Sequence, residues 1–142
     1  MLIVEDDPSI RALVRGVLED VGYPVREASD GAAALDTLYR EQPLALVLDL
    51  GLPYVDGSTV AQAARSLHQG DVPILVISAS ATADAEAREI GASGLLRKPF
   101  LVEDLEVVVG RALAGRDALT PAEREVADRK ALELDASRAK RA

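Results

Sequence analysis

The sequence contains no cysteine and no tryptophan, and its single histidine is His68. The absence of cysteine excludes disulfide bonds, thiolate metal sites and a cysteine nucleophile. One histidine cannot build a multi-histidine metal site, and it leaves no spare base for a serine–histidine triad. Aromatic residues make up only 3% of the chain. A hydrophobic core must therefore be built from leucine, valine, isoleucine and alanine.

Long apolar segments are also missing. No apolar run approaches the ~18 residues of a membrane span. Acidic residues already begin at Glu5, which argues against a signal peptide. The 142 residues match the size of one ordinary domain. We therefore expect a soluble cytoplasmic protein without a membrane segment.

Positive charge is scarce in the first 115 residues. The net charge of the chain is −8, and residues 1–115 carry 9 Lys and Arg against 18 Asp and Glu. Like charges repel the phosphates of DNA, so we do not expect DNA binding through residues 1–115. A surface of this charge is suited to holding a divalent cation.

Short apolar segments alternate with segments whose apolar residues recur at helical spacing. The predicted strands are residues 2–5, 24–28, 44–48, 73–78 and 94–98, and the predicted helices are residues 8–21, 31–42, 57–69, 83–90 and 102–114. This alternation predicts an α/β fold, in which helices cover both faces of a parallel sheet. Residues 44–48 are apolar at every position, as expected for a central strand.

Polar or charged side chains end four of the five predicted strands. The first strand ends in three consecutive acids, and three later strands end in one group each: Glu5, Asp6 and Asp7, then Asp49, Ser78 and Lys98. Each has a purely structural explanation, since Asp7 suits the N-cap of helix 8–21 and Asp49 suits a turn. In an open parallel sheet, however, ligands bind outside the carboxyl ends of the strands. The combination therefore predicts one site at this edge.

The residue types at this edge favour phosphoryl transfer. Clustered carboxylates repel one another, and Mg²⁺ relieves that repulsion while keeping several of its waters. A carboxylate beside the metal is ionised at neutral pH and can attack phosphorus, which gives an aspartyl phosphate. Magnesium, the ammonium of Lys98 and the hydroxyl of Ser78 suit the charge on the transferring oxygens.

Four sequence motifs carry a family resemblance. In order, "LIVEDD", "LVLDLGLPYVDG", "ISA" and "KPF" resemble the receiver domain of two-component response regulators, over roughly residues 1–114. The resemblance implies a flavodoxin-like, doubly wound, five-stranded parallel sheet of order 2-1-3-4-5 with five helices. It also implies a receiver domain over residues 1–115. The composition of residues 116–142 differs, and we expect them to form a charged helical tail or linker.

The resemblance assigns a role to each residue of the predicted site. Asp49 is expected to accept a phosphoryl group from a histidine kinase or a phosphotransfer protein. Mg²⁺ is expected to bind Asp6, Asp7, Asp49 and the carbonyl of Gly51, with Ser78 as the switch hydroxyl and Lys98 joined to Pro99 by a cis bond. Such a domain catalyses only its own phosphorylation and dephosphorylation, and its switch controls a downstream effector.

Two features depart from the family. Leu95 stands where most receivers carry tyrosine or phenylalanine, and the stretch from Ser78 to Gly91 is slightly short, so the helix over residues 83–90 is expected to be reduced. Both changes fall on the face that receivers commonly use for output or for forming a homodimer. These departures therefore put the family's usual output through this face in doubt more than they do phosphorylation.

The tail leaves a second function open. "TPAE" at 120–123 is a capping box that predicts a charged helix from Pro121 towards Ala139, which extends the preceding helix or pairs with another chain. "LTPAEREV" also resembles the opening of a LuxR-type helix-turn-helix domain, so a DNA-binding regulator with a truncated output segment is an alternative.

Two further alternatives are disfavoured by the residues at the site. An aspartyl-phosphate hydrolase usually needs a second acid just after the nucleophile, and Gly51 stands there. A degenerate receiver that acts only as a scaffold would not need the full set of Asp6, Asp7, Asp49, Ser78 and Lys98.

Overall fold

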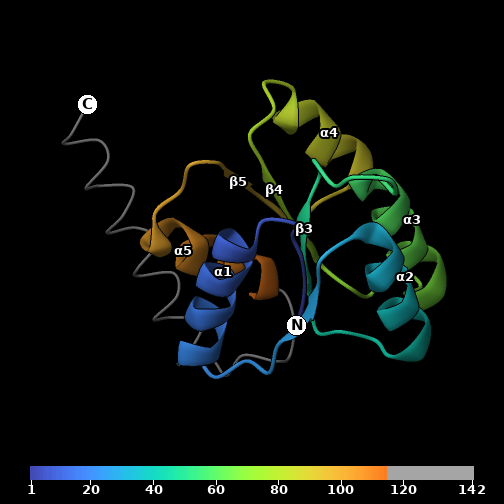
Figure 1. Cartoon of the computed structure of the whole chain (residues 1–142), viewed down its shortest axis with the longest axis horizontal. Coiled ribbons are helices and arrows are strands. Elements are labelled where there is room, and N and C mark those ends of the chain that lie inside the picture. Colours follow the sequence, from blue (N-terminus) through green and yellow to red (C-terminus); the bar gives the residue numbers. More distant parts are fainter. Residues whose placement is uncertain (115–142) are drawn as a thin grey trace.

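The computed structural model describes residues 1–114 and shows five strands alternating with five helices (Figure 1). The strands are β1 (Leu2–Val4), β2 (Arg26–Ala28), β3 (Leu46–Asp49), β4 (Ile74–Ser78) and β5 (Gly94–Arg97). The helices are α1 (Pro8–Asp20), α2 (Gly31–Arg40), α3 (Gly57–His68), α4 (Ala83–Ile90) and α5 (Val102–Leu113). All neighbouring strands pair in parallel, in the order β2-β1-β3-β4-β5. The predicted fold and strand order are confirmed.

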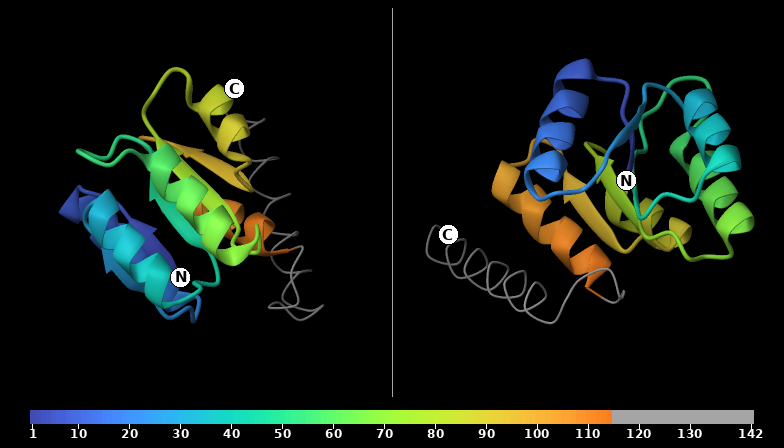
Figure 2. Two further views of the ribbon diagram at one scale, coloured as in Figure 1. Left: turned by 90° about the vertical axis from the view of Figure 1, so that its right-hand side faces the viewer. Right: turned by 90° about the horizontal axis from the view of Figure 1, so that it is seen from below.

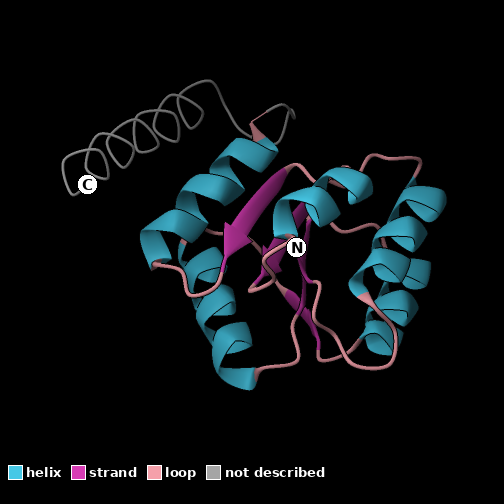
Figure 3. Cartoon of the chain, turned by 90° about the horizontal axis from the view of Figure 1, so that it is seen from above, coloured by secondary structure: helices cyan, strands magenta, loops and turns pink. Residues whose placement is uncertain are grey.

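The sheet separates two hydrophobic layers, because successive side chains of a strand point to opposite faces. Leu48 and Val76 belong to the cluster under α2, α3 and α4, whereas Val47 and Ile77 belong to the cluster under α1 and α5. The three views agree on this arrangement, with α1 and α5 on one side of the sheet and α2 and α3 on the other (Figures 2 and 3). The central strands are buried on both faces, which fixes the position of their last residues.

Three aspartates begin helices on the edge of the sheet where the strands end. The side chains of Asp7, Asp30 and Asp56 accept hydrogen bonds from main-chain amides in the first turns of α1, α2 and α3. Such a cap satisfies amides that have no partner within the helix. The α4 helix spans Ala83–Ile90 and has no side-chain cap, and its 8 residues make it the shortest of the five helices described.

A close contact holds the end of β3 against the start of α3. A Cβ atom built on Gly57 would lie 2.9 Å from the Cα of Leu50 and 3.1 Å from the carbonyl oxygen of Asp49. Only a residue without a side chain lets the helix approach the strand so closely. The main chain on both sides of Asp49 is therefore held in place by the packing of α3.

The predicted helix from Pro121 towards Ala139, and with it the tail over residues 116–142, lies outside the described residues. Within residues 1–114, no helix combines the length and the apolar character needed to cross a membrane.

Candidate functional site

The ends of β1, β3, β4 and β5 enclose a hollow of about 400 Å³. It is lined by Glu5, Asp6, Asp7, Asp49, Leu50, Gly51, Ser78, Ala79, Ser80, Glu86 and Lys98. Every residue that the sequence analysis assigned to the site therefore lines one hollow at the predicted edge. The roles of these residues follow from the contacts that each side chain makes.

Asp49 is the last residue of β3 and is almost fully buried. Its Oδ1 accepts a hydrogen bond of 2.9 Å from the main-chain amide of Gly51, and its Oδ2 lies 3.3 Å from the Nζ of Lys98. One carboxylate oxygen is thus held by the turn that follows the strand, and the other faces a positive charge. This arrangement fixes the carboxylate at the end of the strand beside a positive charge, where it can act as a nucleophile.

Glu5 follows β1 and is the most deeply buried acid of the site, with 1% of its surface exposed. Its Oε2 lies 3.1 Å from the Nζ of Lys98, and its Oε1 accepts a hydrogen bond from the main-chain amide of Asp7. Burial raises the pKa of Glu5 to about 7, and the nearby charge of Asp49 adds to this rise, against the lowering effects of Lys98 and the Asp7 amide. A cation at the site would favour the ionised form of Glu5.

Lys98 joins the two buried carboxylates. Burial disfavours its charged form, but the hydrogen bond to Glu5 and the charges of Asp49 and Glu5 outweigh that effect, so the pKa of Lys98 is raised. The ammonium therefore stays charged at neutral pH. The bond from Lys98 to Pro99 is cis, as the family resemblance implied.

Three acids are close enough to hold one metal ion. Glu5, Asp6 and Asp49 each offer an oxygen, and these atoms all lie within 4.8 Å of one another. Three carboxylates with no nitrogen or sulfur ligand are a donor set for a hard divalent cation such as Mg²⁺. Oε2 of Glu5 is buried, and apart from its ion pair with Lys98 it accepts no hydrogen bond from the described residues, so it can also face such a cation. The residues present therefore fit Mg²⁺.

Asp7 is not part of this acidic group, although the sequence analysis predicted it as a metal ligand. Its Oδ1 accepts hydrogen bonds of 2.8 Å and 3.3 Å from the amides of Ser9 and Ile10, so its carboxylate serves as the N-cap of α1. The residue that the sequence analysis left without a role is Glu5. Its position directly after the apolar residues of β1 was the available signal, because that position points to the sheet edge.

Ser78 ends β4 and is buried, and its Oγ accepts a hydrogen bond of 3.0 Å from the amide of Ser80. Leu95, in β5, is half-buried and packs against the apolar cluster under α2, α3 and α4. A further residue that sequence reasoning missed is Arg11, whose Nη1 donates a hydrogen bond of 2.9 Å to the carbonyl oxygen of Glu5. This contact from α1 helps to hold the main chain beside the acidic group.

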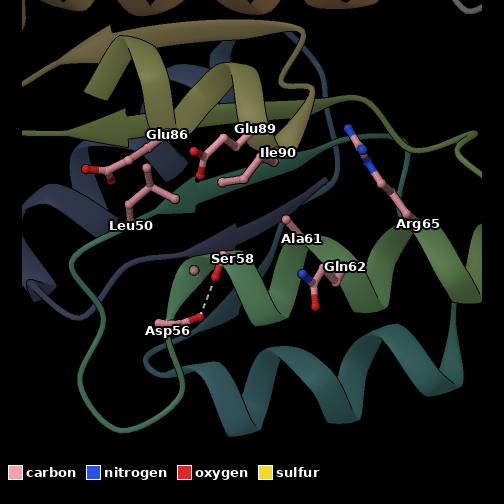
Figure 4. A pocket seen from close by; sticks show the side chains of 10 residues that line it. Leu50, Asp56, Ser58, Ala61, Gln62, Arg65, Glu86, Glu89 and Ile90 are labelled. Carbon is pink, nitrogen blue, oxygen red and sulfur yellow. Dashed lines mark hydrogen bonds between the residues drawn. The ribbon is translucent and has the colours of Figure 1, made fainter. Parts of the chain in front are cut away.

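A second hollow, of about 430 Å³, lies between α3 and α4. Figure 4 shows Asp56, Ser58 and Gln62 along its α3 side and Glu86 and Glu89 along its α4 side. The two hollows share Leu50 and Glu86, so Glu86 stands at the border between them.

Comparisons with known proteins agree with this geometry. The family model described as "Response regulator receiver domain" matches residues 1–110. The chain is 34% identical over 137 residues to the transcriptional regulatory protein PrrA of Mycobacterium tuberculosis, which covers 95% of this chain and 58% of PrrA. The chain spans about half of the length of the curated relatives that it matches.

Solved structures of the same fold come from chemotaxis and from a sensor kinase. The chemotaxis response regulator CheY4 of Vibrio cholerae aligns with a TM-score of 0.72 and 33% identity, covering 79% of this chain and 96% of CheY4. The receiver domain of the sensor histidine kinase PA1611 of Pseudomonas aeruginosa aligns with a TM-score of 0.71 and 30% identity, covering 79% of this chain and 94% of that domain. That structure holds a magnesium ion coordinated in its active-site cleft.

Proposed function

Because the chain belongs to the response regulator receiver family, we propose that Asp49 accepts a phosphoryl group from a phosphohistidine in a magnesium-dependent reaction. The observation that carries the proposal is the position of Lys98, whose Nζ lies within 3.3 Å of both Asp49 and Glu5. This places a fixed positive charge beside a buried nucleophile on an acidic edge. The chain is thus a signalling domain and not an enzyme in the usual sense, and phosphorylation and dephosphorylation of Asp49 are the only reactions that we propose it catalyses.

The chemistry needs little beyond positioning. An oxygen of Asp49 attacks the phosphorus atom, the phosphorus–nitrogen bond of the donor breaks, and the imidazole nitrogen keeps the bonding electron pair. Charge develops on the three other oxygens of the phosphoryl group. The ammonium of Lys98 and the hydroxyl of Ser78 line the hollow where these oxygens would lie, and they can stabilise that charge.

Glu5, Asp6 and Asp49 would hold the magnesium ion, and the carbonyl of Gly51 is proposed as a further ligand. When bound, magnesium lowers the repulsion between the carboxylates and the incoming phosphoryl oxygens. The presence of magnesium in the cleft of the PA1611 receiver supports this proposal. We place the reaction in the cytoplasm, since a phosphohistidine donor is made from ATP.

The donor would be a histidine kinase or a phosphotransfer protein, and the phosphorylated domain would act on a downstream effector. We also propose that the receiver unit ends near residue 115 and that residues 116–142 form a separate tail. The output would include pairing of two copies, which sedimentation before and after phosphorylation would detect.

Intact mass spectrometry tests the phosphorylation proposal directly. After incubation with acetyl phosphate and Mg²⁺, the chain is expected to gain the mass of one phosphoryl group, and peptide mapping should place that group on Asp49. The control is Asp49→Asn, which has nearly the same shape but is a poor nucleophile. A chain that gains no mass, or a variant that gains as much as the wild type, would contradict the proposal.

The name of PrrA favours a second candidate for the output, which is control of transcription. The acidic charge of residues 1–115 opposes binding to DNA. We therefore expect residues 1–142 to give no sequence-specific shift with promoter DNA in a gel-shift assay, with or without phosphorylation. A specific shift that random-sequence DNA does not compete away would favour the second candidate.

A further inference from the structure

Glu86 brings a carboxylate from α4 to the rim of the site. Its Oε1 accepts hydrogen bonds of 3.0 Å from the Oγ of Ser80 and 2.5 Å from the Oγ1 of Thr82. The amide of Ser80 in turn donates to the Oγ of Ser78, inside the hollow. Glu86 is half-buried and lines the same hollow as Asp49 and Lys98. The carboxylate is therefore held in place close to the reacting groups and does not move freely in solvent.

The charge of Glu86 is not balanced locally. Lys98 pairs with Glu5 and Asp49, and these two acids with Asp6 form the group that fits a cation. By contrast, Glu86 makes no ion pair with a lysine or arginine among residues 1–114. An unbalanced negative charge at the mouth of a site lowers the local concentration of anions and slows their approach.

We propose that Glu86 determines which phosphodonors the site accepts. Its carboxylate repels small, free anionic donors, which have only their own phosphate and the metal to hold them. A phosphoryl group carried on a protein histidine is less affected, because contacts between the two proteins bring it to the site against this repulsion. This inference rests on the proposed phosphorylation of Asp49, and it adds a discrimination between donor classes.

The variant Glu86→Gln removes the charge and keeps the side-chain length. Its amide oxygen can still accept the hydrogen bonds from Ser80 and Thr82, so the loop before α4 is expected to keep its shape. The rate constants for phosphorylation would be measured by intact mass with saturating Mg²⁺ and two donors. Acetyl phosphate carries two negative charges at neutral pH, and phosphoramidate carries one net negative charge.

We expect Glu86→Gln to raise the rate constant for acetyl phosphate by roughly fivefold and that for phosphoramidate by about twofold, as repulsion scales with donor charge. High salt should reduce both increases, because it screens charges at the rim. With a phosphohistidine-bearing phosphotransfer protein as donor, the variant should react within about twofold of the wild type, since binding between the proteins dominates.

Two variants provide matched controls. Glu89→Gln makes the same change of charge three residues further along α4, at an exposed position that lines only the second hollow, and it should leave all rates unchanged. Thr82→Val removes the hydrogen bond to Glu86 but keeps the charge, so it should keep the donor preference of the wild type.

Three results would overturn the inference. The first is a ratio of acetyl phosphate to phosphoramidate rates that is the same in Glu86→Gln and in the wild type. The second is an equal rise in Thr82→Val, which would assign the effect to the loop structure. The third is a wild-type chain that takes a phosphoryl group from no donor. In that case the proposed function fails as well, whereas in the first two cases it stands.

Discussion

Replacing Asp6 with asparagine is expected to abolish the magnesium dependence of phosphorylation and to reduce its rate to the level seen with EDTA. Asp6 is the exposed member of the group of three acids whose oxygens lie within 4.8 Å of one another. We expect the magnesium affinity to fall roughly 100-fold or more, because even changes in groups that only orient a ligand cost about 10- to 100-fold. Calorimetric titration with Mg²⁺ measures this directly, and phosphorylation with acetyl phosphate gives the functional effect.

The matched control is the same change at the next residue, Asp7→Asn. The side chain of Asp7 accepts hydrogen bonds from the amides of Ser9 and Ile10, and asparagine caps helices about as well as aspartate. We therefore expect Asp7→Asn to change the magnesium affinity less than about threefold. If Asp7→Asn lost magnesium and Asp6→Asn kept it, the assignment of the acids made from the structure would be wrong.

This pair of variants addresses the point where sequence reasoning was weakest. The sequence places three consecutive acids after the first strand, and it gives each of them the same chemistry. Which of them lie next to Asp49 depends on where β1 ends and α1 begins. Because β1 ends at Val4 and α1 begins at Pro8, the last acid caps the helix, and only the first two bring an oxygen into the acidic group with Asp49. A shift of one residue would have exchanged these roles.

The sheet itself was more predictable, because its signals are local. Apolar runs at β3 and β4 and helical spacing in α1 depend only on neighbouring residues, and the family resemblance supplied the strand order. Asp49, Ser78 and Lys98 followed from these elements, since each stands at or just after the end of a strand. Their shared hollow is thus a consequence of the topology, which brings the carboxyl ends of parallel strands to one edge.

Contacts made by long side chains could not be predicted in this way. The hydrogen bond from Arg11 to the carbonyl of Glu5, and those from Ser80 and Thr82 to Glu86, depend on rotamers and on the packing of whole helices. In the sequence, Glu86 is one of several acids on a weakly amphipathic helix. Only the short loop between β4 and α4 brings its carboxylate to the rim of the site.

Replacing Lys98 with alanine is expected to slow phosphorylation of Asp49 by roughly 100- to 1,000-fold, the usual cost of removing one group that stabilises developing charge. The ammonium lies 3.3 Å from Oδ2 of Asp49, so it is well placed to contact an oxygen of the incoming phosphoryl group. Magnesium affinity should stay the same or increase, because the variant loses a positive charge that competes for Glu5 and Asp49. The two variants are therefore distinguished by their magnesium affinity: Lys98→Ala slows phosphorylation but keeps the affinity, whereas Asp6→Asn loses both.

The neighbouring residue provides the control. Arg97 is exposed and pairs with Asp84 outside the hollow, so Arg97→Gln removes a positive charge from the residue next to Lys98 without touching the site. We expect Asp49 of this variant to be phosphorylated at the wild-type rate. Circular dichroism at neutral pH would show whether Lys98→Ala is still folded, and we expect that it is. The pKa of Glu5 is already raised to about 7, so this acid can take up a proton when Lys98 is lost. A folded Lys98→Ala that is phosphorylated as fast as Arg97→Gln would show that the Lys98 ammonium does not act on the phosphoryl group. The phosphorylation mechanism would then need another source of positive charge.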